Sequence, residues 1–143
     1  MPVKKISVSL SPAASAFVDA RYSRVDGNTS GTISESLERY AAILERERAD
    51  LRSQLSPGEM ALIIDVTNGS LFFSYSLSLL WAEIADGCSL DQLDQKWEVD
   101  AAALVAKVKA SGVAGQAALV DASERWWNRV AAGEQPPFTD LLN

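Results

Sequence analysis

The stretch Lys5-Ile6-Ser7-Val8-Ser9-Leu10, followed by Ser11-Pro12, decides the fold that we expect for this chain. Polar and apolar residues alternate through it, which is typical of a β-strand with one buried face. The apolar side chains would share one face of the strand: Ile6, Val8 and Leu10. The polar side chains would share the other face: Lys5, Ser7 and Ser9.

Two helices are expected after this strand. Ser11-Pro12 predicts a helix start, because serine is a good N-cap and proline is favoured at the first helical position. The first helix would run from Pro12 to about Val25, and Asp26-Gly27-Asn28 would form a turn. A second helix would begin within residues 28–30 and continue to about Leu55. Its charged run, residues 45–48, is predicted to be a solvated face.

A single strand predicts self-association. Alone it would leave its backbone N–H and C=O groups unpaired, and a unit of about fifty residues buries little apolar surface. Two copies could pair their strands antiparallel and pack four helices beneath this ribbon. The predicted dimer core consists of apolar residues of the strand and the second helix: Ile6, Val8, Leu10, Ile33, Leu37 and Tyr40.

The stretch Lys5–Pro12, together with Asn28-Thr29-Ser30-Gly31-Thr32-Ile33-Ser34-Glu35-Ser36-Leu37-Glu38-Arg39-Tyr40, resembles the ribbon-helix-helix superfamily of small bacterial repressors. It is similar to the Arc-like and plasmid copy-number repressors, and the resemblance covers residues 4 to about 45. The resemblance implies an intertwined homodimer that inserts an antiparallel β-ribbon into the DNA major groove. The implied base-reading residues are those on the polar face of the ribbon: Lys5, Ser7 and Ser9.

Phosphate contacts are expected at the start of the second helix. The resemblance places them on the backbone amides of Asn28, Thr29 and Ser30. Elementary electrostatics agrees, because a helix N-terminus has free N–H donors and the positive end of the helix dipole. Lys4 and Lys5 would add charge-based contacts, so we expect the affinity for DNA to fall with salt.

Charge and aromatic content divide the chain in two. Residues 1–55 contain eight Lys/Arg and seven Asp/Glu, a net charge of +1, whereas residues 56–143 contain five and twelve, a net charge of −7. All four tryptophans lie in the second part. We therefore expect a DNA-binding and dimerisation unit at 1–55 and an all-α domain at 56–143 that oligomerises or binds a partner or effector. The predicted fold class is mainly α, with one strand.

The expected helices of the second part follow capping and spacing signals. Ser56-Pro57-Gly58-Glu59 is a capping box, and the helix it opens would end near Asn68-Gly69. Breaks are expected near Asp100 and at Ser111-Gly112. The remaining expectations are a helix ending at Gly87, a final helix over 113–132, an irregular tail over 133–143, and a strand, loop or helix over 70–75.

Composition excludes several functions. The chain has no histidine and one cysteine, so catalysis by a histidine base and an intrachain disulfide are ruled out, and a transition-metal site is disfavoured. No nucleophile, acid–base pair or phosphate loop is recognisable, so we expect no enzyme, no metal and no cofactor. The most apolar stretch, residues 60–81, is interrupted by polar residues, which argues against a membrane span. The expected location is the cytoplasm.

The expected function is a sequence-specific DNA-binding transcriptional regulator, a repressor, that acts as a dimer or a higher oligomer such as a tetramer. Its partners would be double-stranded DNA and a second copy of itself, with a protein partner conceivable through residues 56–143. Two alternatives stay open. One is the antitoxin of a toxin–antitoxin pair that represses its own promoter, and the other is a scaffold or inhibitor that kept the fold without binding DNA.

Overall fold

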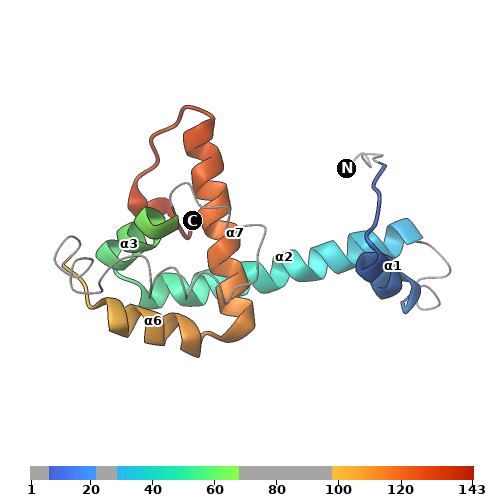
Figure 1. The fold of residues 1–143 in the computed structure, drawn as a ribbon, viewed down its shortest axis with the longest axis horizontal. Helices are drawn as coiled ribbons and strands as arrows, with labels where there is room; N and C mark the ends of the chain where they lie inside the picture. Colours follow the sequence, from blue (N-terminus) through green and yellow to red (C-terminus); the bar gives the residue numbers. More distant parts are fainter. Residues whose placement is uncertain (1–6, 22–28, 68–97) are drawn as a thin grey trace. The chain divides into compact units, whose positions relative to one another are not determined.

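The structure is a computed structural model that describes residues 7–21, 29–67 and 98–143, and these are mainly helical (Figure 1). The chain divides into two compact units, residues 1–41 and 42–143, called here the N-terminal unit and the C-terminal unit. The division falls within one long helix, between Ala41 and Ala42. The division by function at residue 55, expected from charge and aromatic content, stays a prediction.

The predicted β-strand is corrected by the structure. Within residues 7–21, 29–67 and 98–143 there is no strand, and residues 7–10 precede the first helix without regular secondary structure. Lys5 and Ile6 lie outside the described residues. The physical reason is that strand geometry is stabilised by hydrogen bonds to a neighbouring strand, and an alternating sequence alone provides no such neighbour.

Helix α1, Pro12–Asp19, begins as the sequence predicts. The Ser11 side chain accepts a hydrogen bond from the Ala14 N–H at 3.2 Å, and Pro12 follows in the first turn. The helix ends earlier than the predicted Val25, because the Arg21 N–H bonds to the Val18 carbonyl, three residues back, at 2.9 Å. Such an i→i+3 bond tightens the last turn and closes the helix.

Helix α2, Thr29–Gln54, confirms the long second helix. In its last three turns it contributes Leu44 and Leu51 to the core of the C-terminal unit, and Leu55, which follows directly, belongs to the same core. The charged run 45–48 is only partly solvated, since Arg46 is exposed but Arg48 is buried. The prediction for Arg48 was wrong because its long side chain turns toward acidic partners on both sides, as described below.

The C-terminal unit packs helices around one apolar core. Helix α3, Pro57–Thr67, packs against helix α7, Gly112–Ala131, and α7 also packs against helix α6, Ala101–Ala110 (Figure 1). Residues 60–64 of α3 are all buried, so this helix is covered on every side there. The least exposed large side chains of the unit are Leu51, Leu62, Ile63, Leu104, Leu119 and Leu142.

The predicted helix boundaries of this unit agree with the structure where it describes them. The Asp100 side chain accepts from the Ala103 N–H at 2.9 Å and so starts α6. Ser111 lies between α6 and α7, and Gly112, with φ +71°, begins α7 at the predicted break. The expectations for Asn68-Gly69, for residues 70–75 and for the helix ending at Gly87 lie outside the described residues.

The C-terminal segment differs from the irregular tail that the sequence predicts. It includes a short 3-10 helix, η3, Phe138–Asp140, which packs against α3. Leu141 and Leu142 are 2% and 0% exposed and belong to the core. The Trp126 Nε1–H donates to the Pro137 carbonyl at 3.1 Å, which fixes the approach of this segment to α7.

Candidate nucleic-acid interface

The segment before α1 presents every described side chain to solvent. Ser7 and Ser9, two of the predicted base-reading residues, are exposed, whereas Lys5 lies outside the described residues. Val8 and Leu10 are exposed as well, at 56% and 40%. The segment is therefore accessible to a ligand, but in the single chain it has no face that is buried against the rest of the unit.

The N-terminus of α2 has the features that favour an anion. Thr29 and Ser30 are exposed in the first turn, and that turn contains no acidic residue. The first acidic residue of the helix, Glu35, is paired with Arg39 one turn later. A helix of 26 residues has the partial positive charge of its dipole at this end. Lys4 and Asn28, the other predicted phosphate ligands, lie outside the described residues.

Arg21 holds a defined position at the end of α1. Its guanidinium lies 3.5 Å from the centre of the Phe17 ring, and its Nη1 donates to the Phe17 carbonyl at 2.9 Å. A cation over an aromatic face is favoured by the ring quadrupole, and a cation at a helix C-terminus is favoured by the dipole. No role was expected for Arg21 from the sequence, in which its i, i+4 spacing to Phe17 was the available signal.

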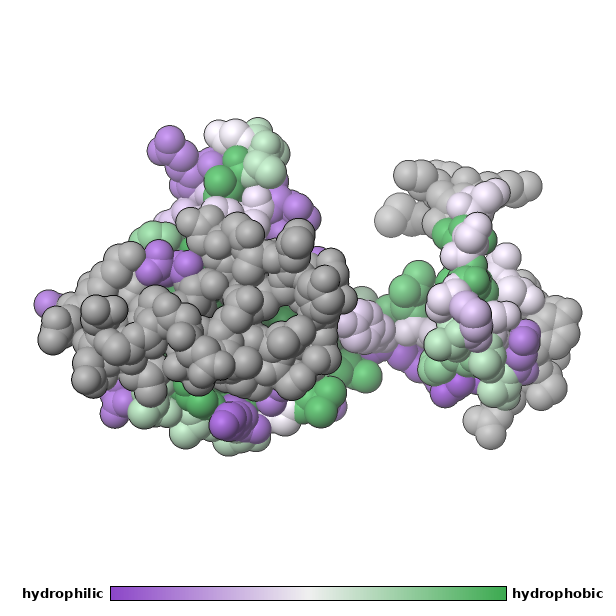
Figure 2. Space-filling model, viewed as in Figure 1, coloured by the Kyte–Doolittle hydropathy of each residue, from purple (hydrophilic) through white to green (hydrophobic). Residues whose placement is uncertain are grey.

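The predicted dimer core is largely exposed in the single chain. Leu37 and Tyr40 of α2 are 61% and 51% exposed, and Ile33 is half-buried. Ile6 lies outside the described residues. Hydrophobic side chains are accordingly visible on the surface of the N-terminal unit in Figure 2. The single chain therefore leaves Leu37 and Tyr40 outside a core.

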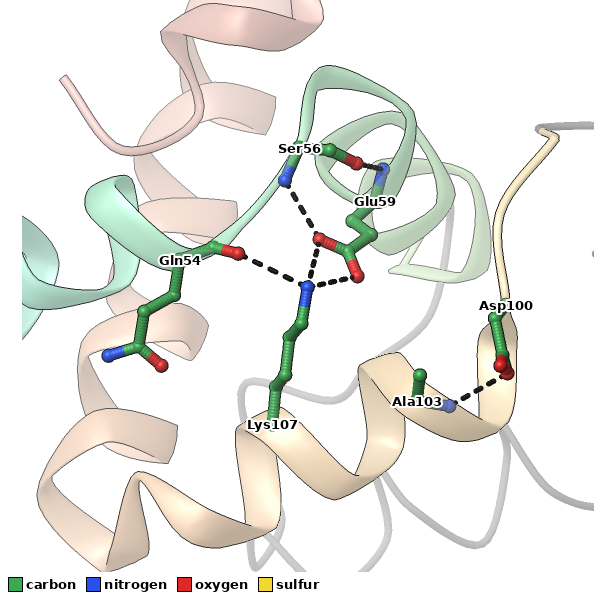
Figure 3. A network of polar contacts seen from close by, with 6 residues as sticks. All are labelled: Gln54, Ser56, Glu59, Asp100, Ala103 and Lys107. Atoms are coloured by element: carbon green, nitrogen blue, oxygen red, sulfur yellow. Dashed lines mark hydrogen bonds and ion pairs between the residues drawn. The ribbon is translucent and has the colours of Figure 1, made fainter.

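The most connected polar group of the C-terminal unit is Glu59 (Figure 3). Its carboxylate accepts from the Ser56 N–H at 2.8 Å, while the Ser56 hydroxyl accepts from the Glu59 N–H at 3.2 Å, which confirms the capping box. Lys107 Nζ lies 2.8 and 3.0 Å from the two carboxylate oxygens and 3.2 Å from the Gln54 carbonyl. The network joins the end of α2, the start of α3 and α6, and it satisfies a buried charge, so we assign it a structural role.

Arg48 is a second buried charge. Its side chain is 6% exposed and forms ion pairs with Glu45 and, at 3.8 Å, with Asp121 of α7. Within the described residues its Nε and Nη1 have no hydrogen-bond partner. A buried guanidinium needs its acidic neighbours to offset desolvation, so the pair with Asp121 couples α2 to α7.

Arg129 forms two ion pairs with the C-terminal segment. It pairs with Glu134 at 2.8 Å and with Asp140 at 3.2 Å. These hydrogen bonds, the one to Glu134 first, raise the pKa of the Arg129 guanidinium above its usual value. The two ion pairs link the end of α7 to the C-terminal segment, and the partial exposure of this link to solvent limits its contribution to stability. The spacing of these residues in the sequence gave no specific signal for it.

Neither a metal site nor a single membrane-spanning helix is found among the residues that the structure describes. Among these residues no group of three Cys, Asp or Glu side chains could hold a metal ion. In the same residues no single helix has the length and apolar character to cross a membrane. Helices α6 and α7 meet those two criteria only when taken together, and they are bent by 117° at their junction.

No protein-family model, no curated protein and no solved structure matches this chain.

Proposed function

We propose that this chain is a DNA-binding transcriptional regulator that acts as a dimer on a short palindromic site. The N-terminal unit would dock on the duplex. Its base contacts would come from Lys5, Ser7 and Ser9, and its phosphate contacts from Lys4 and from the start of α2 at Asn28, Thr29 and Ser30. The assignment of the fold to a strand-based ribbon is not part of this proposal.

The proposal is supported by the occurrence of exposed hydroxyl side chains and a net positive charge in the same unit. Ser7, Ser9, Thr29 and Ser30 are exposed, and all belong to the N-terminal unit. That unit has five Lys/Arg and four Asp/Glu, a net charge of +1, in a chain whose net charge is −6. The C-terminal unit, with eight and fifteen, has a net charge of −7 and would be repelled by phosphates.

The test is DNA binding by the full chain. Fragments of the source genome that bind the purified protein would be sequenced, and the affinity for the enriched site measured by fluorescence anisotropy at several salt concentrations. We expect Lys5→Ala with Ser7→Ala to weaken binding by about 10-fold or more, since each base contact contributes about 1–3 kcal/mol. Lys4→Ala should reduce the salt slope by about one unit.

Lys109→Ala is the matched control, because Lys109 is an exposed lysine of the acidic C-terminal unit. We expect its affinity for DNA to equal that of the unaltered chain. Equal affinity in the Lys5/Ser7 variant would refute the assignment of the N-terminal segment as reader. Absence of any DNA retention at low salt would instead favour the scaffold alternative.

The antitoxin alternative gains no support from the described C-terminal residues. An antitoxin of this kind would offer a partner a short segment that folds on binding. Here Leu141 and Leu142 are buried in the core, and Arg129 clamps Glu134 and Asp140. Co-purification with a small basic partner would be needed to favour this alternative.

A further inference from the structure

Residues 136–142, called here the strap, lie on the C-terminal unit in the manner of a bound linear peptide. They return from the end of α7 to α3, against which η3 packs (Figure 1). Pro136, Leu141 and Leu142 are buried, whereas residues 137–139 between them are exposed. Leu141 and Leu142 belong to the apolar core of the unit. Peptide ligands commonly bind in this way, through a few buried anchors, and leave the other side chains in solvent.

Arginine side chains from two helices bind polar groups of the strap. Arg52 of α2 donates to the Leu142 carbonyl, and Arg129 of α7 donates to the Asp140 carboxylate at 3.2 Å. Within the strap the Asp140 N–H donates to the Pro137 carbonyl at 3.0 Å, which shapes it as a single turn. The rest of the unit therefore supplies donors both for a backbone carbonyl and for the acidic side chain, as a peptide-binding site does.

Trp126 of α7 contacts the proline end of the strap. Its Nε1–H donates to the Pro137 carbonyl at 3.1 Å, and its ring stacks on Phe138 with the ring centres 6.0 Å apart and 29° between the planes. Trp126 is only 7% exposed, so the surrounding core holds this N–H in place. Pro137 has φ −65° and ψ 153°, which is the polyproline II conformation. Sites for proline-rich peptides present aromatic side chains to a ligand in this conformation.

The connection between α7 and the strap contributes little to the position of the strap. Residues 132–135 are all exposed. Gly133 has φ +90°, a conformation that glycine adopts without a steric penalty. The ion pair of Glu134 with Arg129 is partly exposed, and such pairs contribute little to stability. The contacts of the strap itself therefore account for most of its binding to the unit.

We propose that α2, α3 and α7 form a binding site for a linear peptide and that the strap is its built-in ligand, so that the site binds the same sequence when it is not joined to α7. The ligand class is a peptide with a proline in the polyproline II conformation, followed by an acidic residue and two leucines. In the intact chain the strap keeps the site occupied, because a tethered ligand has an effective concentration on the order of millimolar. The inference concerns the C-terminal unit alone and does not rest on DNA binding.

The experiment uses the full chain with Leu141→Asp and Leu142→Asp, which displaces the strap because burial of two unpaired carboxylates is unfavourable. The probe is a fluorescent peptide with the sequence of residues 135–143, and its anisotropy reports binding. We expect the variant to bind the peptide, and the unaltered chain to bind it at least about 10-fold more weakly, since its own strap competes. A peptide with the same two substitutions should not bind.

Gln135→Asp with Thr139→Asp is the matched control, since both residues are exposed and the same charge is added to the same segment. This variant should bind the peptide as weakly as the unaltered chain. If the Leu141/Leu142 variant is unfolded alone, the peptide should restore its helical circular dichroism, because binding to the native state stabilises it. A Leu141/Leu142 variant that neither binds the peptide nor is refolded by it at about 1 mM would overturn the inference. So would equal binding of the peptide to this variant and to the unaltered chain, or equal binding of the two peptides.

Discussion

Leu37 belongs to the N-terminal unit and Leu51 to the C-terminal unit, and both lie on the same helix, α2. They lie fourteen residues apart on α2, about four helical turns, and so point to the same side. Leu37 is 61% exposed, whereas Leu51 is 1% exposed. The same residue type in the same helical register is therefore core in the C-terminal unit and surface in the N-terminal unit. Burial follows from what the rest of the chain places against the helix.

The largest expected effect comes from that pair of leucines. Leu51→Ala should lower the free energy of unfolding by about 2–5 kcal/mol, because it removes methyl groups from a closed core. Leu37→Ala should lower it by less than about 1 kcal/mol in dilute protein, where the dimer is dissociated. Urea unfolding followed by far-UV circular dichroism measures the helices of both units, and tryptophan fluorescence measures the C-terminal unit alone, since all four tryptophans lie there. Equal losses for both variants would contradict the contrast between the units.

The ion pairs of the two units are expected to differ in their contribution to stability. Glu59→Gln should destabilise the C-terminal unit by about 1–3 kcal/mol, because the carboxylate is buried and serves both the Ser56 N–H and Lys107. The exposed side of Lys107 limits the loss. Arg39→Gln, in the exposed pair with Glu35, should change stability by no more than about 0.5 kcal/mol. Urea titrations followed by far-UV circular dichroism, which reports the helices of both units, measure the two losses, and a larger loss in Arg39→Gln would reverse the ranking.

Two serine N-caps with equal hydrogen-bond lengths, one in each unit, are expected to differ less in their effect on stability. Ser11 and Ser56 each accept a backbone N–H at 3.2 Å. Ser56→Ala should lower the stability of the C-terminal unit by about 1 kcal/mol, the usual value of an N-cap. Ser11→Ala should leave the tryptophan-monitored transition in place, because α1 lies in the other unit. A shift of that transition in Ser11→Ala would mean that the two units unfold together.

The smallest expected effect is a gain. Glu98 has φ +53°, a left-handed conformation that costs a residue with a side chain about 1 kcal/mol or more. Glu98→Gly should raise the free energy of unfolding by about 0.5–1 kcal/mol, because glycine adopts this conformation without a steric penalty. The midpoint of urea unfolding would report it. An unchanged or lower midpoint would mean that the Glu98 side chain compensates for the strain.

Local signals in the sequence predicted the helices well. Ser11-Pro12, the capping box at Ser56, Asp100 and Gly112 all mark boundaries that the structure confirms. Each depends on a hydrogen bond or a backbone angle within a few residues, so the neighbouring sequence is sufficient to specify it. Of the candidate interface, the exposure of Ser7, Ser9, Thr29 and Ser30 agrees with the predicted accessibility, and their DNA contacts stay a prediction.

Features that depend on distant residues were not predictable in the same way. The alternation in residues 5–10 predicted a strand, yet a strand needs a partner that this alternation does not provide. Residues 133–143 contain Pro136-Pro137 and looked irregular, but Leu141 and Leu142 fill space left between helices. Arg48 lies in a charged run, and only the position of Asp121 on α7 explains its burial.

The sequence by itself determined where the described helices begin, which half bears the negative charge, and which residue types can and cannot support chemistry. The tertiary structure decided which apolar face is covered. Helical spacing aligns Leu37 and Leu51 on one side of α2, but Leu51 is buried because it shares a core with residues of α3, α6 and α7, whereas Leu37 belongs to no such core. Burial is a property of several segments together, and no single segment encodes it.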